Sequence, residues 1–268
     1  MPETPAAASA AEELTAPPIA PVQVSPWSSL LAMMRWSLAS IGAMLPLIVV
    51  VQAALAAGIV IGFGFLIPDI TPESALFLSS GAPTILLLTV GLVIVPQGVA
   101  RARASGALDY QRALPVSRPL LLLVDLVVWS LIALPGLVIG LLVAWLRYDL
   151  SFSFDWPLLV LVPMLVTTMA TAVGFAIAVT LPAMLAQLVS QVLVFFVLLF
   201  SPITFPASQL PEWFQTVHRF LPIQPAAELL RAGIASADFT AQGRDLVVLS
   251  LWTAVGLLIS TRALVRRG

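Results

Sequence analysis

The chain lacks cysteine and lysine altogether, and only 9% of its 268 residues are charged. Without cysteine it can form no disulfide framework, no thiolate nucleophile and no cysteine-bearing metal site. Without lysine it cannot carry the Walker A motif, whose lysine contacts the nucleotide phosphates in P-loop ATPases. If ATP drives this protein, another chain must therefore hydrolyse it.

Apolar residues are what the sequence has in excess. They make up 60% of the chain, the mean hydropathy is +1.06, and the uncharged runs are longer than a core helix of a soluble domain needs. This composition is typical of an integral membrane protein. We predict an all-α polytopic membrane protein with one membrane domain, residues 25–268. The preceding tail, residues 1–24, is rich in alanine and proline and is predicted to be disordered.

Six segments are apolar over the roughly 20 residues that a helix needs to cross the hydrocarbon. From Trp156 to Pro211 there is no charged residue, which is too long for one helix, and Pro182 marks the natural break. The predicted spans are residues 38–66, 83–100, 120–146, 157–180, 185–203 and 246–261.

A short helix is predicted just before the first span. Ser25 can cap it, Pro26 suits its first position, and Trp27 and Trp36 lie near its two ends. Such a helix, over residues 26–36, is suited to lie in the membrane interface as an elbow. The alternative is that it is only the hydrated start of the first span.

Arginine placement predicts the orientation of the chain. With a cytoplasmic N-terminus, eight arginines lie on the cytoplasmic side, whereas four arginines and most carboxylates lie outside. The positive-inside rule then places both termini in the cytoplasm. We expect a multi-pass protein of the cytoplasmic membrane. A composition rich in alanine, with arginine in place of every lysine, is typical of a bacterial source with a GC-rich genome.

The loop between the second and third predicted spans reads "RARASGALDYQRALPVSR", Arg101 to Arg118. Its arginines can act simply as topology anchors. However, apolar residues are interspersed with them, as in a short helix that fits a cleft on a soluble partner while the arginines meet acidic groups. Both interpretations are open on these residues alone.

A second unusual segment, residues 204–244, precedes the last span. Two helix-sized pieces are visible, over residues 212–220 and 225–234, and both are too short to cross the membrane. They are also too apolar for simple hydrated loops. We expect them to re-enter the outer leaflet or to lie on it, where protein or a water-filled cavity must cover the irregular backbone.

These two segments resemble the permease subunit of ABC-2 type (type-2 ATP-binding-cassette) exporters. The loop "GALDYQRALPVSR" is similar to the family pattern G-x-L-x-x-L-R-x-x-P-V-S-R, and "LPEWF" with "LPIQPAAELLR" is similar to the stretch before the last span. The resemblance implies an elbow helix, a coupling helix at 101–118 and re-entrant helices before the last span. It also implies a dimer of permeases, identical or paralogous, and two ABC ATPase subunits that hold ATP and Mg. The lipid bilayer is the remaining partner, and no nucleic acid is expected.

The resemblance assigns candidate residues to three tasks. Coupling to the ATPase falls to Arg101, Arg103, Leu108, Asp109, Arg112, Leu114, Pro115 and Arg118. A substrate pathway, lined mainly by the second and fifth spans, would include Thr84, Thr89, Gln97, Gln187, Gln191, Phe195, Phe196 and Phe200. An outer gate would include Trp213, Phe214, Glu228 and Arg231.

Several ionisable residues also have simpler interpretations. Asp125, inside the third span, is a functional candidate, but it can also pair with Arg118 or Arg101. Glu228 and Arg231 are three residues apart and most simply pair with each other. The single histidine, His218, is expected to be a polar tip at the interface and is given no role.

The predicted function is that of a transport subunit for efflux, and not of an enzyme. A transporter driven by an ion gradient is the first alternative, but it would normally need ion-handling groups near the membrane midplane, and no span carries a charge at its centre. A membrane-embedded enzyme is the second, but no cluster of catalytic side chains is visible. A pathway of Phe, Leu, Val, Gln and Thr suits a hydrophobic or amphipathic substrate such as a drug, lipid or glycolipid.

Overall fold

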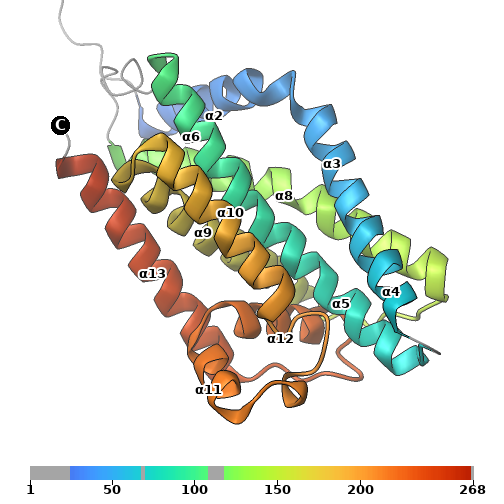
Figure 1. Cartoon of the computed structure of the whole chain (residues 1–268). Helices are drawn as coiled ribbons and strands as arrows, with labels where there is room; N and C mark the ends of the chain where they lie inside the picture. Colours follow the sequence, from blue (N-terminus) through green and yellow to red (C-terminus); the bar gives the residue numbers. More distant parts are fainter. Residues whose placement is uncertain (1–24, 68–69, 108–117, 267–268) are drawn as a thin grey trace, which may run out of the picture.

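The computed structural model describes residues 25–67, 70–107 and 118–266, with the side chains of residues 26, 118–119 and 263–266 excepted. Within this part of the chain the regular structure is helical, apart from one isolated β-bridge between Ser153 and Ala235. The long helices run side by side as a bundle, with α2 and the C-terminal end of α13 at one end (Figure 1).

Six helices in the described part of the chain are long and apolar enough to cross a membrane, as predicted. The first is continuous from α3 (Leu45–Ala57) through the π-helical turn η1 (Gly58–Gly62) to α4 (Phe63–Leu66), and the second from α5 (Pro72–Thr89) through a second π-helical turn, η2 (Val90–Ile94), to α6 (Val95–Ala104). The others are α8 (Arg118–Tyr148), α9 (Trp156–Thr180), α10 (Ala183–Phe200) and α13 (Gly243–Arg266).

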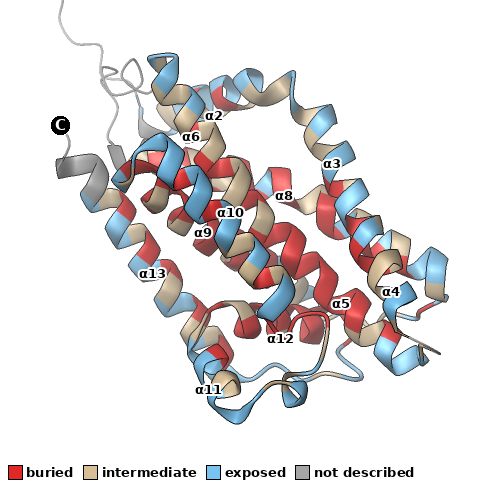
Figure 2. Cartoon of the chain, viewed as in Figure 1, coloured by how far each residue is buried: buried red, intermediate tan, exposed pale blue. Residues whose placement is uncertain are grey.

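The second span is the centre of the bundle. Figure 2 shows α5 as largely buried, whereas α3, α10 and α13 each present an exposed face. Small residues make this position possible: a side chain on Gly91 would collide with Ala170 of α9, and one on Gly174 would collide with the backbone of Gly91. The backbones of η2 and α9 therefore approach more closely than larger residues would allow.

The start of the first span differs from the prediction. The helix predicted over residues 26–36 is α2 (Pro26–Gly42), which extends beyond residue 36, and a turn at Ala43–Met44 separates it from α3. Pro46 lies in the first turn of α3, where its missing N–H costs nothing. The span therefore begins at Leu45 and not at Leu38. Hydropathy could not reveal this break because both sides of it are apolar.

The second span is longer than predicted. It begins at Pro72, where the Thr71 hydroxyl accepts a hydrogen bond from the Ser74 amide at 3.2 Å, and it ends at Ala104. Pro83, which was predicted to start the span, lies within the helix. Proline lacks a backbone N–H, and contacts with neighbouring helices in a packed bundle compensate for the missing hydrogen bond. Arg101 and Arg103 consequently belong to the last turn of α6 rather than to a loop.

A distal layer, defined here as residues 201–242, covers the end of the bundle opposite to α2 (Figure 1). It contains the 3-10 turn η3 (Ala207–Gln209), α11 (Glu212–Phe220) and α12 (Ile223–Ile234). Both predicted helices are present, with α12 beginning two residues earlier than expected. Nearly all of α12 is buried against α5, α9 and α13, whereas most of α11 is exposed.

Candidate functional site

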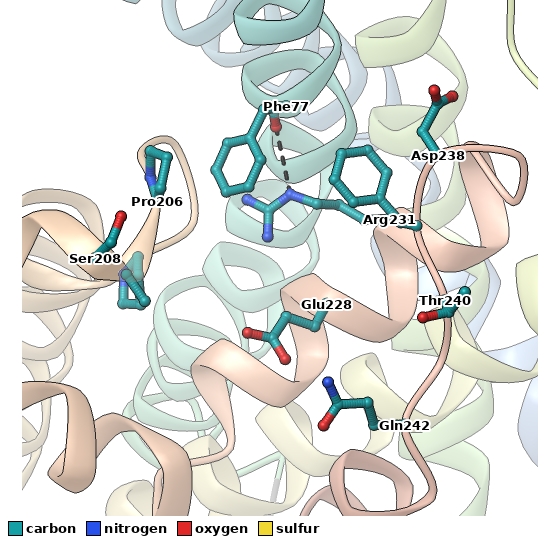
Figure 3. Close-up of a pocket in the computed structure, with 11 residues that line it drawn as sticks. Phe77, Pro206, Ser208, Glu228, Arg231, Asp238, Thr240 and Gln242 are labelled. Carbon is teal, nitrogen blue, oxygen red and sulfur yellow. Dashed lines mark hydrogen bonds between the residues drawn. The ribbon is translucent and has the colours of Figure 1, made fainter.

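Arg231 of α12 is the centre of the distal layer, and only 2% of its surface is exposed. Its Nε donates to the Phe77 carbonyl oxygen at 3.4 Å, and its Nη2 donates to the Ile203 carbonyl oxygen. The guanidinium carbon lies 3.6 Å from the centroid of the Phe77 ring, a cation–π contact (Figure 3). One side chain thus joins α12 to α5 and to the segment that follows α10.

Gly81 of α5 makes this junction possible. A Cβ at position 81 would lie 2.7 Å from Arg231 Nη2 and would collide with the Ile203 carbonyl oxygen. A glycine is therefore required where the arginine and the 201–211 segment cross α5.

Glu228 forms no ion pair with Arg231, so the prediction that these two side chains pair with each other is wrong. Its carboxylate instead accepts a hydrogen bond from Gln224 Nε2 at 2.6 Å. Burial is the main cause that raises the pKa of Glu228, and the neighbouring Asp245 raises it further, while Gln224 and Arg231 act in the opposite direction. Arg231 prefers two backbone carbonyls because the ends of α5 and α10 bring these acceptors within its reach.

Arg231 and Glu228 line a cavity of about 440 Å³ within the distal layer (Figure 3). Phe77 and Phe239 give it aromatic walls, and Ser208, Thr240 and Gln242 add polar groups. A second cavity of about 410 Å³ shares Phe77 and Pro206 with the first. Both have the size of a small-molecule site, and their walls mix aromatic, polar and charged groups.

The other two residues predicted for an outer gate lie on α11. Trp213 is 68% exposed, whereas Phe214 packs edge-on against His218 with ring centroids 4.4 Å apart. His218 is wholly buried, which corrects the expectation of a polar tip. Its Nδ1 lies 3.0 Å from the Phe214 carbonyl oxygen, and its Nε2 has no hydrogen-bond partner among the described residues. Its ring stacks on Phe196 of α10 and so fixes α11 against that helix.

The residues predicted for a substrate pathway differ in their exposure to solvent. Thr84 is buried in the centre of α5, and Thr89 donates a hydrogen bond to the Ile85 carbonyl oxygen at 2.7 Å in its own helix. Gln187 and Gln191 lie on the exposed face of α10. Gln97 is partly buried, Phe195 and Phe200 are exposed, and Phe196 lies between α10 and α11.

Only part of the predicted coupling segment falls within the described residues. Leu108, Asp109, Arg112, Leu114 and Pro115 lie outside them, and Arg118 is the first residue of α8, with its side chain not described. Arg103 donates to the carbonyl oxygens of Val179 at 2.9 Å and Leu181 at 3.3 Å. It therefore satisfies the free carbonyls at the C-terminal end of α9, while Arg101 is exposed.

Asp125 does not pair with Arg101 in the structure. Its side chain is partly buried where α2, α6 and α8 meet, and it forms no hydrogen bond or ion pair with any group that the structure describes. The sequence had identified Asp125 as a functional candidate or as a pairing partner of Arg118 or Arg101, and the side chain of Arg118 is not described.

A model of the family described as "ABC-2 family transporter protein" matches residues 68–262, well over half of the chain. The matched region runs from the connector before α5 to the last span and contains the distal layer. No curated protein matches the chain.

Proposed function

Because the chain belongs to the ABC-2 family of transporter proteins, we propose that it is the permease subunit of an ATP-driven exporter in the cytoplasmic membrane. The family match over the second to sixth spans is the observation that carries this proposal. The six apolar helices supply the membrane-crossing framework. The family is one of transporter proteins, so the proposed role is transport and not catalysis.

A separate ATPase subunit, in two copies with ATP and Mg, would supply the energy. The chain has no lysine for a Walker A motif. The segment from Arg101 to Arg118 is the proposed contact, because it connects two long helices at the end of the bundle where α2 lies. Motion of the ATPase would then reach α6 and α8 directly.

A second permease, identical or paralogous, is proposed to cover α10. This helix presents two glutamines, Gln187 and Gln191, together with Phe195 on its exposed face. Amides facing lipid tails lose their hydrogen-bond partners, whereas a facing permease or a polar pathway restores them. A pathway between two copies of α10, lined by these residues, would suit a hydrophobic or amphipathic substrate.

The distal layer is proposed to close this pathway on the outer side. Arg231 joins α12 to α5 and to the end of α10, so the outer ends of the two proposed pathway helices are fastened to one buried side chain. Release of that contact would free both ends together.

Purification of the tagged chain from its native cell tests the ATPase proposal. We expect a P-loop ATPase in a stoichiometric amount, identified by mass spectrometry and an ATPase assay. The double variant Arg112→Glu and Arg118→Glu should lose most of this partner, because charge reversal opposes acidic groups on it. Arg219→Glu, on the exposed face of α11, is the matched control. A chain that purifies alone, or a double variant that keeps its ATPase, contradicts the coupling role.

Single cysteines test the permease pair, because the natural chain has none. Val192→Cys on the exposed face of α10 should crosslink two permeases in membranes under mild oxidation, since facing α10 helices would bring the thiols together. Leu142→Cys on α8, also an exposed apolar position, is the control that should remain monomeric. Equal crosslinking at the two positions would argue against an interface at α10.

A further inference from the structure

Asp125 lies inside a membrane-spanning helix. Its carboxylate forms no hydrogen bond or ion pair with any group that the structure describes. It lies seven residues after the start of α8, or about 10 Å along the helix axis at 1.5 Å per residue. Ionisable residues in spans are costly, and they normally pair with one another or bind a ligand. Asp125 therefore needs an explanation beyond packing.

The carboxylate lines a cavity of about 130 Å³ between four helices. Ser37 and Ser40 of α2 contribute hydroxyl oxygens, while Trp129 of α8 and Phe175 of α9 contribute aromatic rings. Gly98 of α6 leaves room in the opposite wall, since a Cβ there would meet only Trp129, at 3.5 Å. The cavity thus combines one negative charge, hydroxyl acceptors and two aromatic side chains.

This combination favours a positively charged organic group. Aromatic faces and a carboxylate both attract an ammonium, and neither Arg35 on α2 nor Arg101 on α6 forms an ion pair with Asp125 in the structure. An anion would be repelled by the carboxylate. A hard metal ion would need about six oxygen ligands, and the described residues form no cluster of metal-binding side chains.

The size of the cavity restricts the ligand further. An apolar cavity of about 150 Å³ can hold benzene, so about 130 Å³ accommodates a trimethylammonium head group but not a whole drug-sized molecule. The rest of the ligand must extend out of the cavity. A head group in a protein cavity with an apolar tail in the surrounding lipid describes an amphipath.

We propose that Asp125, Trp129 and Ser37 form a binding site for the ammonium head group of a cationic amphipath. The elbow helix α2 supplies one wall of the site, so a ligand lying in the membrane can reach it without crossing the bundle. The role of this site in loading an exported substrate rests on the proposed transport function. Binding of the head group by the permease itself does not.

Calorimetric titration of the purified permease, without any ATPase, with hexyltrimethylammonium tests the site. We expect saturable binding, and at least tenfold weaker binding of the neutral 1-hexanol and of the anionic hexanoate. Asp125→Asn should weaken binding of the ammonium at least tenfold. Leu123→Ala, on the exposed face of the same helix, is the control that should bind as the natural chain does. Absence of binding to the natural chain, or undiminished binding to Asp125→Asn, overturns the proposal.

A second pair of variants keeps the carboxylate and changes only the space, in case Asp125→Asn does not fold. Gly98→Leu should fill the cavity and abolish binding, whereas Gly42→Leu, at a glycine of α2 outside the cavity whose Cβ would meet no atom within 4 Å, should bind as the natural chain does. Unchanged binding to Gly98→Leu places the ammonium elsewhere and overturns the proposal. If the permease binds the ammonium but purifies without an ATPase, the binding site is supported and the exporter function is contradicted. Failure of the binding site and failure of the proposed function are therefore distinguishable.

Discussion

The second and fifth spans are nearly equal in mean hydropathy, 2.1 and 2.3, yet they occupy opposite positions in the bundle. In the second span, 83% of the most apolar stretch is buried inside the chain. In the fifth span, α10, only 17% of the corresponding stretch is buried. The second contains "SSGA" and Gly91, which let neighbouring helices approach, while α10 carries Leu, Val and Phe with two exposed glutamines. Hydropathy therefore identifies a span, and small residues identify the span at the centre.

Arg231→Ala should have the largest effect, because it removes the side chain that fastens the central helix to the distal layer. The Ile203 carbonyl oxygen would lose its donor in a buried place, and the half-buried Phe77 carbonyl oxygen, which also accepts from Ser80 Oγ, would lose one of its donors. The loss of a donor by a buried acceptor costs roughly 1–3 kcal/mol, and the cation–π contact with Phe77 is lost as well. We expect the free energy of unfolding in detergent to fall by about 3 kcal/mol. Arg219→Ala on the exposed face of α11 should change it by less than about 0.5 kcal/mol. A similar small loss at Arg231 would show that its contacts do not stabilise the layer.

Gly91→Ala should have the next largest effect, since the new Cβ would collide with Ala170 of α9. Overpacking of this kind costs about 1–3 kcal/mol, measurable as a lower thermal midpoint in detergent. Gly58→Ala, in the first span, introduces a Cβ with no neighbouring atom within 4 Å and should leave the midpoint nearly unchanged. Equal tolerance at both glycines would mean that η2 and α9 do not pack as closely as described.

Glu228→Gln should change the pH dependence of stability. Burial, as the largest cause, raises the pKa of the Glu228 carboxyl above its ordinary value of 4.5. The folded chain then holds this proton more tightly than the unfolded chain, so its stabilising contribution is complete below pH 4.5 and is lost as the pH rises through the raised pKa. The amide cannot titrate, so the loss of thermal stability as the pH rises above 4.5 should be smaller in the variant. Parallel profiles for both proteins would exclude Glu228 as the titrating group.

Leu188→Ala on the exposed face of α10 should have the smallest effect on the single chain, within about 0.5 kcal/mol of the natural free energy of unfolding. Its effect should appear instead in association, as a lower dimer fraction in the Val192→Cys crosslinking assay. If unfolding is affected strongly and crosslinking is not, α10 is a packed internal helix and the contrast with the second span disappears.

The number and order of the spans could be predicted from sequence because a bilayer imposes a minimum apolar length. The two helices of the distal layer were also predictable, since prolines punctuate that segment. The turn at Ala43–Met44 was not predictable, because apolar sequence continues across it. The extension of the second span to Pro72 was missed for the opposite reason, because polar residues such as Glu73 and Ser79 lower the hydropathy of its first turns. The π-helical turns η1 and η2 carry no signal in hydropathy, and they shift the face on which later residues lie.

The candidate site was predicted only in part. Arg231 was selected, but with Glu228 as its partner, because sequence spacing shows neighbours on one helix and not carbonyls 154 and 28 residues away. One available signal was the composition of "QPAAELLRAGI", whose small and apolar residues indicate a helix buried on most sides. His218 was expected at the surface because a lone histidine in an interfacial helix is usually a polar tip. The spacing of apolar residues does not show whether such a side chain is buried.

The short backbone pairing between the α8–α9 connector and the end of α12 has a consequence for any movement of α12. The Ser236 amide donates to the Ser153 carbonyl oxygen at 2.8 Å, and the Asp155 amide donates to the Gly233 carbonyl oxygen at 2.9 Å. These bonds fasten α12 to the first turn of α9, the helix against which the centre of the bundle also packs. A displacement of α12 must therefore either carry α9 with it or break both bonds. In hydrogen–deuterium exchange these two amides should lose protection together, as one cooperative unit.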